Sequence, residues 1–271
     1  MYTLPILHNL PMVPPMMALD TFSLGPITVH VWGLFVSAGF AAGIALAFFR
    51  ARNSGVFNPE RILDLAMWIL GGSLVGARFF HVFFYEPAFY FSTPLEILKF
   101  WEGGMSSFGG FLGAFFSGWW YLRRHALDLL TWADLAIFGL PAGLAIGRIG
   151  CFLTHMHPGI KSNFFLAVMM EDGPRLELGL IEAILAFGIL LLFLVLGRRP
   201  HRRGFFLSLF LLVYAPARFL MDFLRATDLS MADVRYLGFT PAQYGCLLFI
   251  ALGTALIWQQ KGEQRRGDSA R

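Results

Sequence analysis

The sequence has 271 residues, of which 57% are hydrophobic and only 14% are charged, and its mean hydropathy is +0.63. This composition excludes an ordinary soluble domain, in which about a quarter of the residues are charged. The two cysteines, Cys151 and Cys246, both lie in apolar stretches, so no disulfide framework is indicated. The net charge is only +4. Its distribution is more informative than its size, because basic residues report the orientation of a membrane protein.

Taken in chain order, the sequence predicts an N-terminal arm, a membrane domain and a short tail. Residues 1–27 are apolar but interrupted by prolines, which predicts an irregular arm or short helix on the membrane surface rather than a cleavable signal peptide. Each apolar span of the domain is about twenty residues long, enough to cross about 30 Å of hydrocarbon as a helix. The domain, 28–258, holds seven spans, at 28–49, 62–85, 104–122, 132–153, 177–197, 205–224 and 240–258, and the basic tail is 259–271.

The lysines and arginines predict the orientation of these spans. The loops after spans one, three and five and the C-terminal tail together carry 13 of the 21 basic residues, and the opposite side carries 4. Cytoplasmic loops carry the excess of basic residues, so we expect the N-terminus outside and the C-terminus in the cytoplasm. The predicted fold class is therefore an all-α polytopic membrane protein, with seven transmembrane helices around an outward-side polar cavity.

Four further arginines lie within or at the ends of spans, in their outer halves: Arg78, Arg148, Arg218 and Arg225. A guanidinium keeps its proton and is costly in hydrocarbon, so each needs an anion, a carbonyl cluster or a water-filled cavity. Nearby carboxylates are Asp134, Glu182 and Asp222. One interpretation is an ion-pair network that locks helices together. We favour an anion site, because four arginines exceed three carboxylates and the planar guanidinium suits phosphate.

Glycines accompany these arginines. Gly143, Gly147 and Gly150 surround Arg148 and would let another helix or a ligand approach the backbone. Two glycine pairs, 103–104 and 109–110, bracket the start of the third span. They indicate either tight helix packing or an unwound turn whose amides face the cavity.

Several common catalytic motifs are absent. The sequence has no P-loop, no Gly-x-Ser-x-Gly, no His-Glu-x-x-His and no Cys-x-x-Cys pair. His155 and His157 could bind a metal, but no carboxylate or thiolate is evident beside them, so we expect no metal and no cofactor. His81 is interpreted as a packed or hydrogen-bonded core histidine, and Cys151 as a small apolar residue beside the predicted cavity.

Four segments then suggest a family: VGARFFHVFFYEP, WEGGMSSFGGFLGA, GRIGCFLTHMHPG and YAPARFLMDFLRATD. They resemble, in order and spacing, motifs of the bacterial prolipoprotein diacylglyceryl transferases, and the resemblance covers nearly the whole chain. It implies transfer of the diacylglyceryl group of phosphatidylglycerol to the lipobox cysteine of a preprolipoprotein, giving a thioether and glycerol 1-phosphate. The implied partners are phosphatidylglycerol, preprolipoprotein signal peptides and the lipid bilayer, with no nucleic acid. The implied location is the bacterial inner membrane.

The resemblance also implies site residues. The implied catalytic residues are Arg148, Arg218, Tyr214 and Asp134, with the two arginines on the phosphate. The implied phosphatidylglycerol-binding residues are Arg78, Arg148, Gly104, Gly109, Gly110, Glu182, Asp222, Arg225 and Gln243.

The chain also departs from the family motifs. The loop histidine of the family, its usual candidate base, corresponds to Phe108, and the tyrosines of spans one and two correspond to Trp32 and His81. Other polar motif positions hold Cys151, Thr154, Met156 and the segment 176–179. Two hypotheses remain: a divergent transferase in which another group or phosphate electrostatics replaces the base, or a relative that binds an anionic lipid and has lost or changed the reaction. A solute transporter is disfavoured, because no inverted repeat of half-helices is evident.

Overall fold

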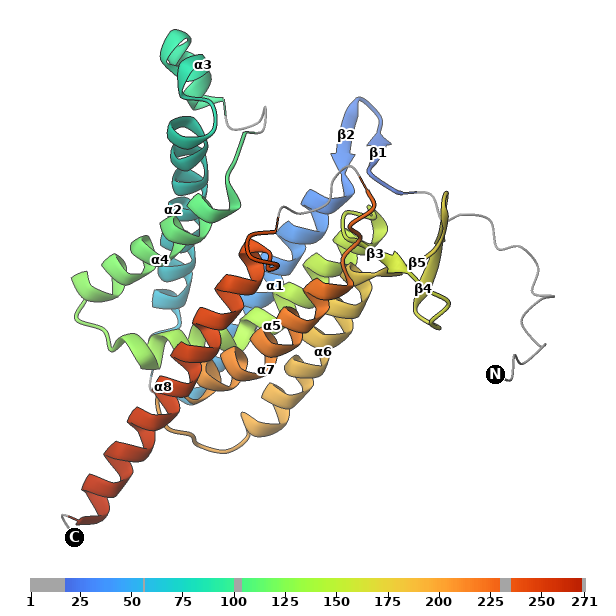
Figure 1. Cartoon of the computed structure of the whole chain (residues 1–271). Helices are drawn as coiled ribbons and strands as arrows, with labels where there is room; N and C mark the ends of the chain where they lie inside the picture. The colour runs from blue at the N-terminus through green and yellow to red at the C-terminus, as the bar shows by residue number, and fades with distance from the viewer. Residues whose placement is uncertain (1–17, 56, 100–103, 230–234, 270–271) are drawn as a thin grey trace, which may run out of the picture. The chain divides into compact units, whose positions relative to one another are not determined.

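The computed structural model describes residues 18–55, 57–99, 104–229 and 235–269, so Gly103 of the predicted glycine pair and residues 1–17 of the arm lie outside it (Figure 1). Its long helices are α1 (Val31–Ser54), α2 (Glu60–Phe84), α4 (Ser107–Arg124), α5 (Leu129–Leu153), α6 (Leu178–Leu196), α7 (Phe205–Met221) and α8 (Pro241–Ser269). The chain divides into two compact units, residues 1–43 with 140–271 and residues 44–139. Helices α1 and α5 contribute to both.

Six helices of the described chain are long and apolar enough to cross a membrane: α1, α2, α5, α6, α7 with the turn η4 (Asp222–Leu224), and α8. The chain is therefore a mostly helical, multi-pass membrane protein. The predicted span at 104–122 corresponds to α4, which is not among the six. Glycines, serines and a terminal pair of arginines lower the mean hydropathy of this 18-residue helix. The seventh span remains a prediction, as does the orientation.

In the first unit, glycines bring α1 and α5 into backbone contact. A Cβ atom on Gly39 would lie 2.5 Å from the carbonyl oxygen of Gly143, and one on Gly150 would lie 2.6 Å from Cβ of Phe35. Real Cβ atoms do not approach so closely, so both positions require glycine. The glycines around Arg148 thus serve helix packing on the α1 side.

This unit also contains two small sheets, one before α1 and one between α5 and α6. Strands β1 (Thr21–Leu24) and β2 (Ile27–His30) form an antiparallel hairpin, and Leu19 donates a hydrogen bond to the carbonyl of Leu153 at 2.8 Å. The expectation of an irregular arm or helix is therefore wrong for these residues. Between α5 and α6, strands β3 (Pro158–Lys161), β4 (Ala167–Met170) and β5 (Gly173–Glu177) form an antiparallel sheet in the order β3-β5-β4.

One buried arginine fastens the second sheet. Arg175 is 1% exposed, and its guanidinium donates to Asp172, to Asp228 at 2.6 Å and to the carbonyl of Gly159 at 3.0 Å. These contacts tie β5 to β3 and to the segment that follows η4. The sheet thereby gains a fixed attachment that its four- and five-residue strands would not supply alone.

In the second unit, α2 and α4 pack through small residues. A Cβ on Gly76 would lie 2.4 Å from the carbonyl oxygen of Gly109, and one on Gly113 would lie 2.0 Å from that of Gly72. Gly109 therefore serves tight helix packing, one of the two roles considered for the glycine pairs. Gly104 instead lies in a non-helical turn with φ of +68°, before the helix cap formed by Ser106, so the unwound-turn alternative describes this glycine.

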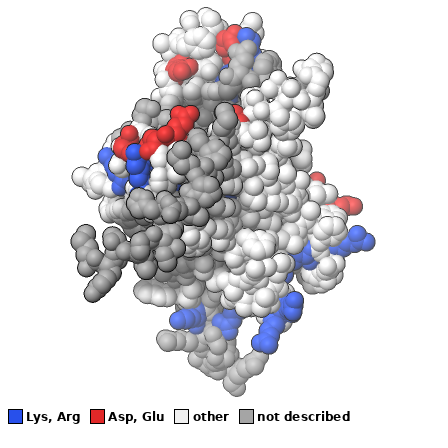
Figure 2. All heavy atoms as spheres, turned by 90° about the vertical axis from the view of Figure 1, so that its right-hand side faces the viewer, with Lys and Arg blue, Asp and Glu red and all other residues white. Residues whose placement is uncertain are grey.

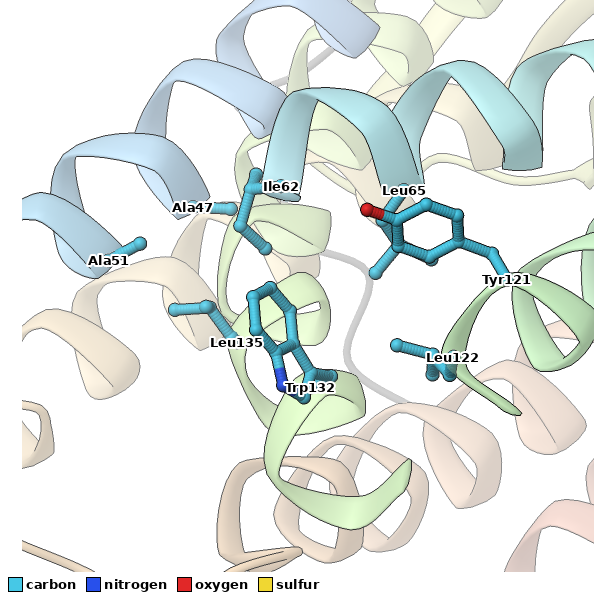
Figure 3. Packing of buried hydrophobic residues seen from close by; sticks show 8 residues of the cluster. All are labelled: Ala47, Ala51, Ile62, Leu65, Tyr121, Leu122, Trp132 and Leu135. Atoms are coloured by element: carbon cyan, nitrogen blue, oxygen red, sulfur yellow. The ribbon is translucent and has the colours of Figure 1, made fainter. Parts of the chain in front are cut away.

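The second unit also has a compact apolar core, drawn in Figure 3. The ring of Trp132 on α5 lies 5.6 Å from that of Phe57 in an edge-on arrangement. Full burial of an aromatic side chain of this kind stabilises a fold by about 3 kcal/mol. The buried members are Ala47, Ala51, Ile62, Leu65, Tyr121, Leu122, Trp132 and Leu135.

Outside these contacts, much of the surface is apolar. Among the described residues on the face drawn in Figure 2, most of the surface belongs to residues other than Lys, Arg, Asp and Glu. Large apolar residues of the described helices are also widely exposed, including Phe111 at 75% and Phe115 at 62%. Such a surface suits lipid rather than water.

Candidate functional site

The centre of the candidate site in the first unit is the carboxylate of Glu182. Helix α6 carries this side chain at a position that is 3% exposed. Its Oε1 lies 3.0 Å from a terminal nitrogen of Arg148 on α5, and it also accepts a hydrogen bond from the hydroxyl of Tyr214 on α7. Its Oε2 lies 3.8 Å from Nε of Arg218, one turn further along α7. One carboxylate thus joins two arginines across three helices.

A second carboxylate, that of Asp222 at the end of α7, also pairs with Arg218. Arg218 donates to Oδ1 of Asp222 at 2.5 Å, the i,i+4 contact expected on one helix face. The hydroxyl of Thr240 donates to the other oxygen, and Asp222 is 1% exposed. We call Arg148, Glu182, Tyr214, Arg218 and Asp222 the arginine–carboxylate network. Arg148 and Arg218 therefore form ion pairs with Glu182 and Asp222, two of the three carboxylates considered as partners from the sequence.

Gln243 lies beside this network but is engaged with the backbone. Its Oε1 accepts from the amide of Thr240 at 2.9 Å, while Thr240 Oγ1 accepts from the amide of Gln243 at 3.2 Å. This reciprocal pattern is a capping box at the start of α8. The remaining amide group donates to the carbonyl of Phe219 at 3.1 Å. Gln243 therefore joins the start of α8 to the end of α7, and it is fully buried.

Cys151 contacts Arg148 directly. Its Sγ lies 3.8 Å from a terminal nitrogen of the guanidinium, and the residue is 5% exposed. Thiol sulfur is only a weak acceptor. The contact consequently leaves this nitrogen of Arg148 more available to an oxyanion than a carboxylate partner would. The sequence interpretation of Cys151 as a small apolar residue missed this contact.

His157, in the loop between α5 and β3, lies within the electrostatic reach of the same arginines. Burial is the largest cause that lowers the pKa of its imidazole to about 3; the charges of Arg148, Arg225 and Arg218 contribute to this shift, and the charge of Asp222 opposes it. The ring is therefore neutral at physiological pH. Its Nδ1 is buried and has no hydrogen-bond partner within the described residues.

A second titratable pair lies at the junction of β5 and α6. Nδ1 of His155 is 3.4 Å from Oε2 of Glu177, a carboxyl that is fully buried. Burial raises the pKa of Glu177 to about 7, with the amide of Gly179 acting in the opposite direction. The prediction that no carboxylate lies beside His155 is wrong, because the antiparallel sheet brings Glu177 back to it. Nevertheless, the described residues contain no group of three or more His, Cys, Asp or Glu that could hold a metal ion.

In the second unit, Arg78 is received by a carbonyl cluster. It is 3% exposed and donates to the carbonyls of Ile97 at 3.0 Å, Gly104 at 3.1 Å and Glu96. Its guanidinium also lies 5.0 Å from the ring centroid of Tyr90. Arg78 thereby organises the segment between α2 and α4.

Two further site candidates lie in the second unit. Asp134 interacts electrostatically with Arg50, whose guanidinium lies 3.8 Å from the ring centroid of Phe138. Phe108, at the family's histidine position, is 57% exposed, and its ring lies 5.1 Å from that of Phe80. Arg50 was not predicted as a partner of Asp134, because the sequence places it in the loop after the first predicted span.

A family model and individual known proteins that resemble this chain indicate the same family. The family model described as prolipoprotein diacylglyceryl transferase matches residues 20–259. The phosphatidylglycerol–prolipoprotein diacylglyceryl transferase of Nitratidesulfovibrio vulgaris is 32% identical over 246 residues, which is 89% of this chain and 92% of the relative. The protein of that name from Pseudomonas aeruginosa is 30% identical over 257 residues, 92% of this chain and 96% of the relative. The one from Nitrosomonas europaea is 32% identical over 245 residues, 87% of each chain.

Proposed function

Because the chain belongs to the prolipoprotein diacylglyceryl transferase family, we propose that it transfers the diacylglyceryl group of phosphatidylglycerol to the lipobox cysteine of a preprolipoprotein. The cysteine sulfur forms a thioether bond to the diacylglyceryl carbon, the bond from that carbon to the phosphate oxygen breaks, and glycerol 1-phosphate leaves. The thiol proton is released. The observation that supports this function best is the pair Arg148 and Arg218 held by the single carboxylate of Glu182.

The network supports the reaction through charge. Two fixed guanidinium groups can hold the phosphate of the lipid and neutralise the charge that develops on the leaving phosphate. Their orientation is fixed before the substrate arrives, because Glu182 and Asp222 already hold them. A guanidinium close to the incoming cysteine would also favour its thiolate form. A thiol with a pKa near 8.5 is already a few per cent ionised at neutral pH, so electrostatics supplies part of what a base would supply.

The remaining implied residues have supporting roles in this proposal. Tyr214 donates to Glu182 and so helps to hold this carboxylate, while Asp222 pairs with Arg218 and Gln243 joins the start of α8 to the end of α7. In the second unit, Arg78 and Gly104 shape the turn before α4, and Gly109 and Gly110 let α4 approach α2. We retain Asp134 as a proposed catalytic residue and Arg225 as a proposed lipid contact on the resemblance alone.

The proposed membrane arrangement follows from the same residues. We propose α4 as a seventh span and the bacterial inner membrane as the location, with the N-terminus outside and the C-terminus in the cytoplasm. Four arginines, at 198, 199, 202 and 203, lie between α6 and α7. Arg218 lies at the other end of α7 and Arg148 in the last two turns of α5. Basic loops inside would thus place the network toward the outer leaflet.

The alternative, a relative that binds an anionic lipid without this reaction, is favoured by Phe108 at the position of the family's histidine. Purified protein in phosphatidylglycerol vesicles with a lipobox peptide distinguishes the two. We expect a mass gain on the peptide cysteine together with release of glycerol 1-phosphate. Phosphatidylglycerol binding without either product would exclude the transferase and leave the alternative.

A pair of variants ties the assay to the network. Arg148→Ala should lower transfer at least 100-fold, because removal of a positioned charge from a transition-state site costs about that much. Arg199→Ala, a matched loss of an exposed arginine in the basic loop, should leave transfer unchanged. Folded Arg148→Ala protein with full activity would contradict the proposed phosphate contact.

A further inference from the structure

His157 has a hydrogen-bonding atom that the described protein leaves unused. Its Nδ1 is inaccessible to solvent and has no hydrogen-bond partner among the described residues. Most buried polar atoms in folded proteins are paired, and an unpaired one destabilises the protein unless something binds it. The backbone of His157 is fixed, because its carbonyl accepts from the amide of Leu178 at 3.2 Å. An unpaired atom on an anchored residue indicates a site for a ligand atom.

The charges around His157 decide what that atom can do. Arg148 on α5, Arg218 on α7 and Arg225 beyond η4 act on the ring with positive charge, and Asp222 acts on it with negative charge. Burial disfavours the protonated ring, which would also add a fourth positive charge there, so the imidazole stays neutral and is a poor proton acceptor. A neutral Nδ1 either donates or accepts one hydrogen bond, depending on the tautomer.

The neighbouring arginines indicate the chemistry of the ligand atom. In the function proposed above, Arg148 and Arg218 bind the phosphate of phosphatidylglycerol, so they already supply its charged donors. On the leaving side of this phosphate, the nearest hydrogen-bonding groups beyond the ester oxygen are the two hydroxyl groups of the glycerol head group. A hydroxyl donates and accepts, so it matches Nδ1 in either tautomer.

We infer that His157 is a specificity-determining residue, whose imidazole hydrogen-bonds to a hydroxyl of the glycerol head group while the arginine–carboxylate network holds the phosphate. This inference rests on the proposed function. It gives His157 a role in selecting the lipid and not in removing the thiol proton. A site with a buried group that needs a substrate hydroxyl rejects the analogue that lacks it, because its own polar atom is then left unpaired.

The test compares phosphatidylglycerol with phosphatidylpropanol, which carries the same phosphate charge but no head-group hydroxyl. Both binding to the purified protein and transfer to a lipobox peptide are measured for each lipid. We expect the protein to prefer phosphatidylglycerol at least about 10-fold, the effect of one hydrogen bond to a buried partner. In His157→Phe, which keeps a ring and removes both nitrogens, the preference should fall to about 1, with phosphatidylpropanol binding retained.

Three further variants complete the test. His157→Asn places an amide near the position of Nδ1 and should restore most of the preference, and His157→Leu is a second deletion with a smaller side chain. The matched control His155→Leu removes a neighbouring histidine that already has Glu177 as its partner, and its preference should equal that of the unmodified protein.

The outcomes separate the inference from the proposed function. Equal binding of the two lipids by the unmodified protein, or a preference that survives both His157→Phe and His157→Leu, would overturn the inference. Selective binding of phosphatidylglycerol without transfer of either lipid would refute the proposed function and uphold the role of His157.

Discussion

The central prediction concerns Glu182, because two arginines depend on its single negative charge. Glu182→Gln keeps the shape of the side chain and an oxygen that can accept from Tyr214, but it removes the charge. At an effective dielectric constant of about 20, attraction across 3.0 Å to Arg148 amounts to about 5.5 kcal/mol, and across 3.8 Å to Arg218 to about 4.4 kcal/mol. The cost of desolvating these groups offsets much of that gain. We expect the free energy of unfolding to fall by about 3 kcal/mol, as in other broken buried pairs.

The assay is equilibrium unfolding by sodium dodecyl sulfate in mixed micelles that contain a neutral phospholipid, followed by tryptophan fluorescence. The control is Glu86→Gln, whose carboxylate is 55% exposed and lies 3.8 Å from His81. An exposed pair contributes about 1 kcal/mol or less. A stability of Glu182→Gln within about 0.5 kcal/mol of the unmodified protein would refute the reasoning, because the network would then not depend on this charge.

Anionic lipid should restore part of the lost stability. With Glu182 neutral, the guanidinium groups of Arg148 and Arg218 keep only Asp222 as a charged partner within the network, so a lipid phosphate would bind them more tightly. A 10-fold gain in affinity restores up to about 1.4 kcal/mol through linkage. Replacing phosphatidylcholine by phosphatidylglycerol should therefore stabilise Glu182→Gln more than it stabilises the unmodified protein. Equal stabilisation of both would show that the lipid phosphate does not contact these arginines.

Three other predictions concern individual residues. Burial raises the pKa of Glu177 from 4.5 to about 7, so its stabilising contribution is complete below pH 4.5 and is lost as the pH rises through 7. Unfolding measured across this range should show a decline of about 3 kcal/mol that Glu177→Gln removes, and a decline that persists in the variant would contradict this assignment. Arg175→Met should speed amide hydrogen exchange throughout β3 and β5. The exposed control Lys161→Met should have a smaller effect, and equal effects of the two variants would show that Arg175 does not hold the sheet in place. Phe108→His should raise transfer if the missing base limits the rate, and an unchanged rate would assign the limit elsewhere.

Hydropathy alone predicts six of the membrane helices, because long apolar runs have few other stable arrangements in lipid. It also identifies the network, since a charge such as Arg148 or Glu182 within such a run needs a partner. Hydropathy does not predict that Arg78 binds backbone carbonyl groups. The carbonyls of Glu96, Ile97 and Gly104 carry no signal in the sequence, and only the fold of that segment brings them together.

The sheets were not predicted, and the reason is physical. Strands β3, β4 and β5 are four or five residues long, too short for an alternating pattern to be distinguished from an irregular loop. Arg175, which attaches the sheet to the rest of the unit, has its partner, Asp228, 53 residues away in the sequence. Without the sheet, nothing in the sequence indicates that Glu177 returns to His155, or that His157 is fixed beside the arginines.

The departures from the family motifs concentrate where this sheet begins. Three polar motif positions at the end of α5 and just beyond it hold Cys151, Thr154 and Met156. Thr154 turns its hydroxyl back to the carbonyl of Gly150 at 2.9 Å, and Cys151 offers only a weak sulfur contact to Arg148. These positions therefore offer fewer hydrogen-bonding groups than the polar residues of the family motif. His157, three residues after Thr154, has a buried Nδ1 without a hydrogen-bond partner among the described residues. A lipid phosphate held by the arginines needs no base beside it, but a selective head-group site needs at least one such uncharged group.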